Sequence, residues 1–226
     1  MIDAIVLDVE TLNNPSAIGW ATSGLGVGLA VVYESRRDRF TCYGNSAVGQ
    51  GDVAALIARI RAADIVAGFN IWAFDLPVIF GIDKREWAAS ADAIRIRERS
   101  IVFDARRLLM SGLGLNPNGG ATGEGTNLHS LALATLGIQA GGGKSLDSAA
   151  LPDMIRLGSP ADVLAAAGEC MRHVALERDL CRFMLRHGYA LAGDGRRAQL
   201  LPDGELWEAA PLFRNRLGGI FGSEII

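Results

Sequence analysis

The segment Ile5-Val-Leu-Asp-Val-Glu-Thr11 is the one around which the rest of the chain is expected to be organised. Its alternating, β-branched apolar residues predict a strand buried in a core. Asp8 and Glu10 are two residues apart, so both lie on one face of that strand. Neighbouring carboxylates repel each other and are expensive to desolvate, and a divalent cation with oxygen ligands is a common compensator. The alternative is that both acids reach solvent past the strand end.

The composition is that of one soluble globular domain. The chain has 226 residues, of which 50% are hydrophobic and 21% are charged, so it can bury a sizeable core. Its net charge of -3 argues against a protein that binds nucleic acid mainly through non-specific phosphate contacts. A local basic groove is still compatible with this net charge. The three cysteines have no metal-type spacing, the N-terminus does not resemble a signal peptide, and no apolar stretch could span a bilayer. We therefore predict a cytoplasmic protein without a membrane partner.

Strands and helices are expected to alternate through the first half of the chain. Apolar alternation predicts three antiparallel strands joined by turns, at Ile5–Thr11, Val27–Tyr33 and Arg39–Tyr43. Asp52 is expected to cap a helix that ends near Ala62. The next expected elements are a strand at 65–70, a helix at 73–80, a strand at 100–104 and a helix at 105–110.

The second half is expected to be mainly helical, with helices at 127–136, 146–157 and 159–187. Ser159 as N-cap and Pro160 at the first helical position mark the start of the long last helix. Its expected buried stripe has apolar residues at three- and four-residue spacing: Leu164, Ala167, Met171, Val174, Cys181 and Leu185. Glu169, His173 and Glu177 lie on a neighbouring stripe, which is either the edge of an active site or an ordinary solvated flank.

This order of elements predicts the fold class and the domain organisation. Three antiparallel strands followed by alternating helices and strands correspond to an α/β, ribonuclease H-like mixed sheet. In such a sheet the later strands are parallel and helices flank both faces. Residues 1–190 would form this domain, and residues 191–226 would form a C-terminal hairpin and tail packed on it.

Two acidic motifs, in this order, carry a family resemblance. The first is Asp8-Val-Glu10-Thr11 on the expected first strand, and the second is Gly68-Phe-Asn70-Ile-Trp-Ala-Phe74-Asp75, where a strand leads into a helix. With these motifs the chain resembles the DEDD superfamily of 3′-5′ exonucleases, which share the ribonuclease H-like fold. Phe103-Asp104, Leu128-His-Ser-Leu131 and Gly143-Lys-Ser145 are similar to the uncharacterised predicted-exonuclease branch of that superfamily. The resemblance covers roughly residues 1–190.

The third motif of the family is divergent in this chain. Members carry a Tyr or His and a fourth Asp on the last long helix. Here Glu169 stands where Tyr is expected, and His173 stands where the fourth Asp is expected. In an alternative alignment of the third motif, His173 is the base and Asp179 is the acid. The spacing between these two residues is then one residue longer than the motif requires. That extra residue rotates the acid by about 100° away from the required face of the helix.

The resemblance implies hydrolysis with two divalent cations, Mg²⁺ or Mn²⁺, held mainly by carboxylates. Asp8 would bridge both ions, Glu10 would hold one, and Asp75 would support the other. Thr11 and Asn70 would position the terminal nucleotide.

Three roles stay open for His173. It could replace the missing carboxylate as a nitrogen ligand, or act as general base oriented by Glu169. It could also mark a site that no longer holds two ions. We treat His129 and His187 as structural or surface residues.

The sequence therefore predicts a metal-dependent 3′-5′ exonuclease that hydrolyses phosphodiester bonds at the single-stranded 3′ ends of DNA or RNA. The first alternative is a catalytically degenerate domain that binds nucleic acid or a protein partner. The second is a structural module in which Asp8 and Glu10 bind one metal ion for stability.

Overall fold

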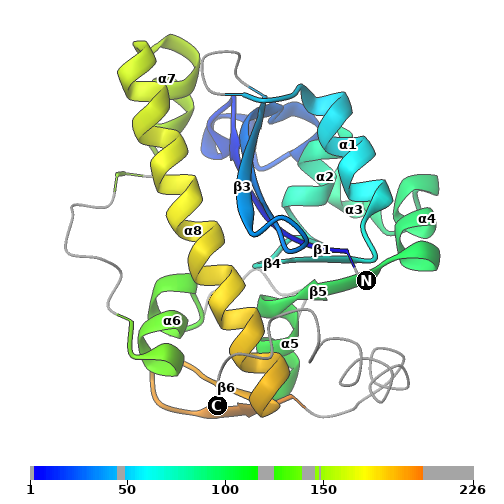
Figure 1. Cartoon of the computed structure of the whole chain (residues 1–226), viewed down its shortest axis with the longest axis vertical. Coiled ribbons are helices and arrows are strands. Elements are labelled where there is room, and N and C mark those ends of the chain that lie inside the picture. The colour runs from blue at the N-terminus through cyan, green and yellow to red at the C-terminus, as the bar shows by residue number, and fades with distance from the viewer. Residues whose placement is uncertain (1–2, 45–48, 117–124, 139–145, 148, 201–226) are drawn as a thin grey trace.

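A mixed five-stranded sheet forms the centre of the molecule (Figure 1). The computed structural model describes residues 3–44, 49–116, 125–138, 146–147 and 149–200. The sheet order is β3-β2-β1-β4-β5. β1 pairs with β2 antiparallel and with β4 parallel, β2 pairs with β3 antiparallel, and β4 pairs with β5 parallel. The strands are β1 (Ala4–Thr11), β2 (Val27–Glu34), β3 (Arg39–Gly44), β4 (Ile65–Gly68) and β5 (Ile101–Asp104). The protein is thus an α/β protein, as predicted.

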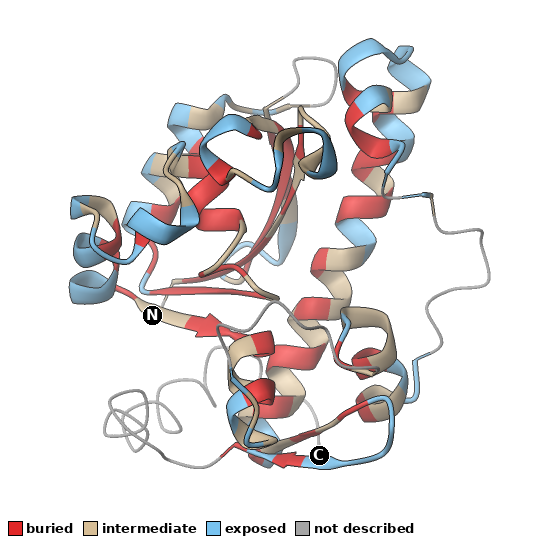
Figure 2. Ribbon diagram, turned by 180° about the vertical axis from the view of Figure 1, so that it is seen from behind, coloured by how far each residue is buried: buried red, intermediate tan, exposed pale blue. Residues whose placement is uncertain are grey.

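Helices cover both faces of the sheet, as Figures 1 and 2 show. One face packs against α1 (Val53–Ala62), α2 (Asp75–Phe80), α3 (Lys84–Trp87) and α4 (Ala91–Arg99). The other packs against α5 (Ala105–Gly112), α6 (Leu128–Leu136), α7 (Leu151–Leu157) and α8 (Pro160–His187). Each face therefore has its own buried apolar cluster, coloured red on the inner sides of the helices in Figure 2.

The alternation of β1 determines where its acids go. Ile5, Leu7 and Val9 belong to the core beneath α1 and α2. Ala4 and Val6 belong to the core beneath α8, so Asp8 and Glu10 continue this second row and face α8.

The turn between β4 and α2 corrects two predicted boundaries. β4 ends at Gly68 rather than at Asn70, and α2 begins at Asp75 rather than at Ala73. The reason is that Asn70 has a left-handed backbone (φ 67°) and its N–H donates to the Asp104 carboxylate at 3.0 Å. A residue in that conformation ends the strand and forces a turn before the helix can start.

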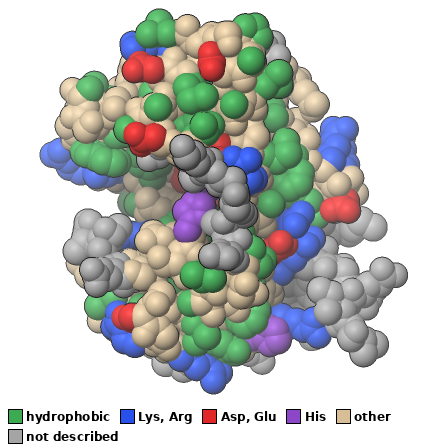
Figure 3. Space-filling view, turned by 90° about the vertical axis from the view of Figure 1, so that its left-hand side faces the viewer, with side chains coloured by type: hydrophobic (Ala, Val, Ile, Leu, Met, Phe, Trp, Pro, Cys, Tyr) green, Lys and Arg blue, Asp and Glu red, His purple; other side chains and the backbone are tan. Residues whose placement is uncertain are grey.

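The buried face of α8 differs from the predicted stripe. Leu164 and Met171 are 60% and 36% exposed. Figure 3 shows that apolar side chains also lie at the surface of the molecule. Ala167, Val174 and Cys181 of the predicted stripe are buried, as expected. The other residues turned inward are Val163, Ala166, Glu169, Cys170, Glu177, Leu180 and Met184. Small side chains such as Ala and Cys let the helix approach the sheet closely, and hydrophobicity alone had favoured the larger Leu and Met. As a result, Glu169 and Glu177 lie inside rather than on a solvated flank.

The boundaries of α8 match the sequence, whereas α7 is shorter than predicted. Ser159 forms a capping box with Asp162, and Gly188 closes the C-terminus of α8 in a left-handed conformation. α7 begins at Leu151, not at residue 146, with Pro152 in its first turn.

Beyond α8 the chain forms a short hairpin of β6 (Tyr189–Leu191) and β7 (Arg197–Gln199), which packs on the α5–α8 side. The predicted tail falls largely on residues 201–226, which lie outside the described residues. None of the helices in the described ranges combines the length and the apolar composition that a membrane span requires.

Candidate functional site

The candidate site lies where the C-terminal end of β1 meets α8. The Asp8 and Glu10 side chains are 18% and 14% exposed, so they are largely withdrawn from water. The pairing of β1 with β2 shifts register between Glu10 and Thr11, at the C-terminal end of the strand. The two acids therefore lie near the end of the strand, and both keep some contact with solvent.

His173 of α8 is surrounded by carboxylates. Its Nδ1 lies 3.3 Å from Asp8 Oδ2 and 3.9 Å from Glu10 Oε1, and its Nε2 lies 3.5 Å from Glu169 Oε1. Burial alone would lower the pKa of His173, but the negative charges of Asp8 and Glu10 outweigh it and raise the pKa. Glu169 in turn forms an ion pair with Arg172. The structure thus brings together four of the predicted site residues.

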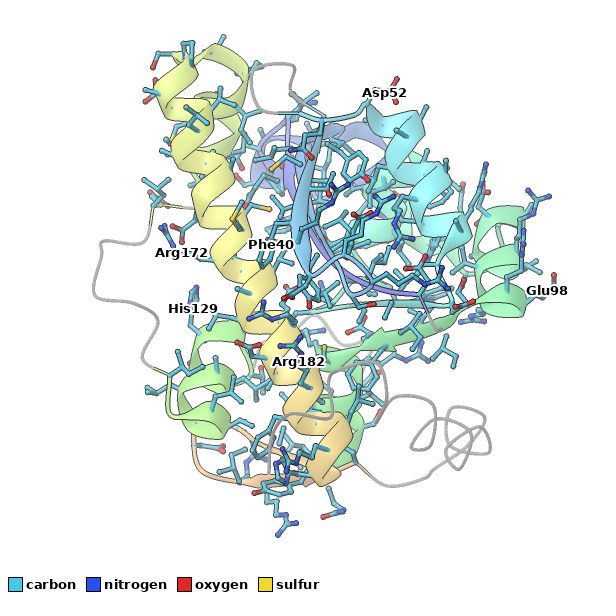
Figure 4. All side chains as sticks on the ribbon, viewed as in Figure 1. Phe40, Asp52, Glu98, His129, Arg172 and Arg182 are labelled. Carbon is cyan, nitrogen blue, oxygen red and sulfur yellow. The ribbon has the colours of Figure 1, made fainter. Side chains whose placement is uncertain are left out.

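His129 is a neighbour that the sequence did not reveal. Its ring packs edge-on against that of His173, with centroids 5.3 Å apart. Figure 4 shows His129 and Arg172 on the side of α8 that faces away from the sheet. Burial, followed by the charge of His173, lowers the pKa of His129. The neutral form of His129 is therefore favoured beside His173, whose own pKa is raised.

Asp75 joins the site from the other face of the sheet. It is 3% exposed, and its Oδ1 accepts a hydrogen bond from the Val9 N–H at 3.1 Å. Because β4 stops at Gly68 while β1 continues, this carboxylate takes the place that a paired strand would occupy. Burial and the charges of Asp8 and Asp104 raise the pKa of Asp75 well above its ordinary value.

Two further buried acids lie beside these residues. Asp104 caps α5, and its carboxylate accepts hydrogen bonds from the N–H groups of Asn70, Trp72 and Arg107. Glu177 of α8 is 2% exposed, and burial together with Asp8, Asp75 and Asp104 raises its pKa well above the ordinary value. Sequence periodicity had placed Glu177 next to His173 but did not indicate its burial.

The donor atoms of the site suit a hard divalent cation. Carboxylate oxygens of Asp8 and Glu10 and the Cys170 sulfur lie within 4.8 Å of one another, a spacing compatible with a metal ion. Burial and the neighbouring acids raise the pKa of Cys170 well above its ordinary value, which keeps it a thiol. Its S–H donates to the Asp8 carbonyl oxygen at 3.5 Å. Of these donor atoms, the carboxylate oxygens are the type that Mg²⁺ and Mn²⁺ prefer.

The electrostatics of Glu10 also favour a positive partner. Burial and the Asp8 charge raise the pKa of Glu10 from 4.5 to about 7, although His173 acts to lower it. Carboxylates that share a withdrawn site ionise together only when an added positive charge compensates them. The arrangement can hold a cation, and with His173 it can also accept a proton.

The two residues predicted to position a nucleotide make local contacts. Thr11 is 5% exposed and its hydroxyl donates to the Asn13 carbonyl oxygen at 2.8 Å. Asn70 is one of three described non-glycine residues with positive φ, and its Oδ1 accepts from Arg106 Nη1 at 3.4 Å. Such backbone strain clusters at functional sites, and the nucleotide-positioning role of both residues stays a prediction.

Comparison with known proteins identifies no family for this chain. No protein-family model matches the sequence, and no curated protein matches it significantly.

Proposed function

We propose that this protein is a metal-dependent 3′-5′ exonuclease with a ribonuclease H-like fold, acting on phosphodiester bonds of DNA or RNA. The observation that carries the proposal is the gathering of Asp8, Glu10 and Asp75 at the end of the central strand, opposite His173 of α8. These are the residues of the two acidic motifs, and the hydrogen bond from Val9 to Asp75 joins the two motifs across 66 residues of sequence. The sheet order also supports it, with the antiparallel pair β2–β3 on one side of β1 and the parallel strands β4 and β5 on the other.

The residues divide the work of hydrolysis between them. Asp8 and Glu10 would hold one cation, and Asp8 with Asp75 would hold a second. When bound, such cations stabilise the charge that develops on the attacking and leaving oxygens of a phosphoryl transfer. His173, flanked by Asp8 and Glu169, is placed to take a proton or to offer a ring nitrogen as ligand. The burial of Asp75 keeps competing water away from its carboxylate.

The test is hydrolysis of single-stranded DNA and RNA oligonucleotides that carry a 5′ label, with Mn²⁺, with Mg²⁺ and with EDTA. We expect a ladder of labelled products that shorten progressively by one nucleotide from full length. Attack from the 5′ end would instead release the label at once, and internal cleavage would give short labelled products from the start. EDTA and the Asp8→Asn substitution should both abolish the ladder. A ladder that survives Asp8→Asn would come from a contaminating nuclease, and the absence of a ladder with every metal would refute the proposal.

A degenerate binding module is the second candidate, and the position of His173 favours it. Protonated His173 lies within ion-pair distance of both Asp8 and Glu10, so it can neutralise them without a metal ion. In that case fluorescence anisotropy should detect oligonucleotide binding that is unaffected by EDTA and is not followed by hydrolysis.

The His173→Asp substitution separates the roles of this histidine. If the site lacks only a carboxylate, the substitution should increase Mg²⁺-dependent hydrolysis. If His173 transfers a proton itself, the same substitution should decrease it.

A further inference from the structure

Trp20 is an exposed aromatic residue with a strained backbone. It is 54% exposed, and no other Phe, Tyr or Trp in the described ranges is exposed to this extent. Its φ of 62° lies in the left-handed region, which is uncommon for a bulky residue. Such strain persists only where the surrounding structure imposes it, and it clusters at ligand-binding and active sites.

The loop that carries Trp20 is fixed to the rest of the fold. It follows β1 directly, and a hydrogen bond from the Leu12 N–H to the Gly26 carbonyl oxygen, at 3.1 Å, closes its base. Further along the loop, Thr22 is 1% exposed, and its hydroxyl donates to the Ile82 carbonyl oxygen beyond α2 at 2.8 Å. The exposed position of Trp20 is therefore imposed by a loop that is itself held in place.

This loop places Trp20 beside the start of α2, and thereby near the acids. The ring centroids of Trp20 and Phe74 are 6.4 Å apart, at an interplanar angle of 61°. Phe74 directly precedes Asp75, whose carboxylate accepts from the N–H of Val9, the residue between the two acids of β1. Because the rings of Trp20 and Phe74 meet edge to face, their contact leaves aromatic surface available for stacking.

The acids by themselves do not favour binding of a nucleic-acid backbone. Asp8, Glu10 and Asp75 repel the negative charge of a phosphate unless cations are bound. Stacking of a base on an aromatic side chain does not require a charge, and every base offers a face for it. An exposed tryptophan next to these acids therefore supplies the type of contact that the acids lack.

We propose that Trp20 is a substrate-binding residue that stacks on the base of the 3′-terminal nucleotide. The phosphodiester bond of that nucleotide would then lie at the acids of β1. The fixed loop holds the indole ring in place before the substrate binds, which reduces the entropy lost on binding. The resemblance gives nucleotide-positioning roles to Thr11 and Asn70 and none to Trp20, which lies outside all of its motifs. The inference rests on the proposed function.

The test measures KM and kcat of Mn²⁺-dependent hydrolysis for the wild type and Trp20→Gly. Two single-stranded oligonucleotides are compared, one intact and one whose 3′-terminal nucleotide is abasic. Glycine adopts a positive φ without strain, so this variant removes the ring and keeps the backbone. With the intact oligonucleotide, KM should rise about 5- to 150-fold in the variant while kcat stays nearly the same. With the abasic oligonucleotide, the two chains should have similar KM values.

Three further variants separate stacking from other losses. Trp20→Phe keeps an aromatic ring and should retain most of the affinity for the intact oligonucleotide. Ile94→Ala removes a 47% exposed apolar side chain from α4, which leads into the start of β5, and should leave KM unchanged. Trp20→Gly should melt near the wild-type temperature, whereas Trp20→Ala should melt below Trp20→Gly, because alanine keeps the strain of a positive φ.

Fluorescence anisotropy in EDTA gives a readout without hydrolysis. The intact oligonucleotide should bind the wild type more tightly than it binds Trp20→Gly. The abasic oligonucleotide should bind both chains equally, because it has no terminal base to stack.

The outcomes separate this inference from the proposed function. Equal KM values for the wild type and Trp20→Gly, an equal effect of the abasic end in both chains, or a Trp20→Gly variant that melts far below the wild type would each overturn the role of Trp20. Hydrolysis in those cases would leave the proposed function standing. Conversely, oligonucleotide binding that Trp20→Gly weakens, without hydrolysis by the wild type, would uphold the stacking contact and reject the exonuclease. A wild type that neither hydrolyses nor binds would overturn both.

Discussion

Glu34 and Glu177 are two glutamates with the same burial and opposite surroundings. Each is 2% exposed. Glu34, at the end of β2, accepts hydrogen bonds from Arg59 at 2.9 Å, Arg39 at 3.1 Å and Arg37 at 3.2 Å. Glu177 has one backbone partner, and the carboxylates that surround it repel it.

The pKa shifts of the two glutamates express this difference. Burial acts to raise the pKa of Glu34, but its hydrogen bonds to the arginines outweigh burial and lower it. Burial also raises the pKa of Glu177, and there the neighbouring acids add to the rise. Arginines therefore compensate the buried charge of Glu34, whereas the charges that act on Glu177 are those of Asp8, Asp75 and Asp104.

The largest effect is expected when a charge is removed from the acids that surround Glu177. Asp8→Asn should lower the rate of metal-dependent hydrolysis by about 10³-fold or more, below what the oligonucleotide ladder detects, since charge stabilisation by a bound metal ion is worth several kcal/mol. The melting temperature in EDTA should stay the same or rise, because less repulsion remains near Glu177 and Asp75. Hydrolysis rates and melting curves of the same preparations check both parts. A fall in activity that merely follows a fall in stability would contradict the prediction.

Removing a charge from the arginines that surround Glu34 should instead lower stability. Arg59 binds both Glu34 and Asp3 and is 15% exposed. Arg59→Ala should lower the free energy of unfolding by about 3 kcal/mol, because it leaves Glu34 buried with fewer partners. The control is Arg61→Ala on the same helix, where a 41% exposed guanidinium pairs with Asp92 and should contribute less than about 1 kcal/mol. Urea unfolding measures both, and equal losses would mean that burial of the partner acid does not matter.

The third test concerns the space that Glu177 occupies. A Cβ at Gly68 would overlap the Ile71 side chain and lie 2.7 Å from the Leu7 carbonyl oxygen. Gly68→Ala should therefore destabilise the fold by about 1 to 3 kcal/mol. Gly168→Ala is the matched control, because a Cβ there meets nothing within 4 Å and alanine favours the helix by about 0.5 to 1 kcal/mol. Opposite signs in urea unfolding are expected, and two similar values would count against the close approach at Gly68.

Local sequence signals predicted the positions of most strands and helices. Apolar alternation placed the strands of the antiparallel half, and Ser159 and Gly188 placed both ends of α8. These signals are local, because a cap or an alternating strand is encoded within a few residues. The β4–α2 boundary was wrong because Asp104, 34 residues further along, fixes the conformation of Asn70.

The candidate site was predictable only in part. Asp8, Glu10 and His173 were expected to face one another, and the structure places them together. The burial of Glu177 was not predictable, because an acid on a helix is ordinarily a solvated residue and hydrophobic periodicity favoured the Leu164–Met171 face. The contact between His129 and His173 joins two helices that carry no shared sequence signal.

The smallest expected effect is an acid dependence specific to the paired glutamate. The pKa of Glu34 is lower in the folded chain than its ordinary value of 4.5, so its pairing stabilises the fold above that pH. This contribution is lost as the pH falls through the lower, folded pKa. The difference in unfolding free energy between the wild type and Glu34→Gln should therefore shrink below pH 4.5, as urea titrations between pH 7 and 3 can measure. Glu98→Gln, at an exposed glutamate of α4 (Figure 4), is the control and should follow the wild type throughout. A constant difference for Glu34→Gln across this range would mean that the arginines hold its neutral form as well as its charged one.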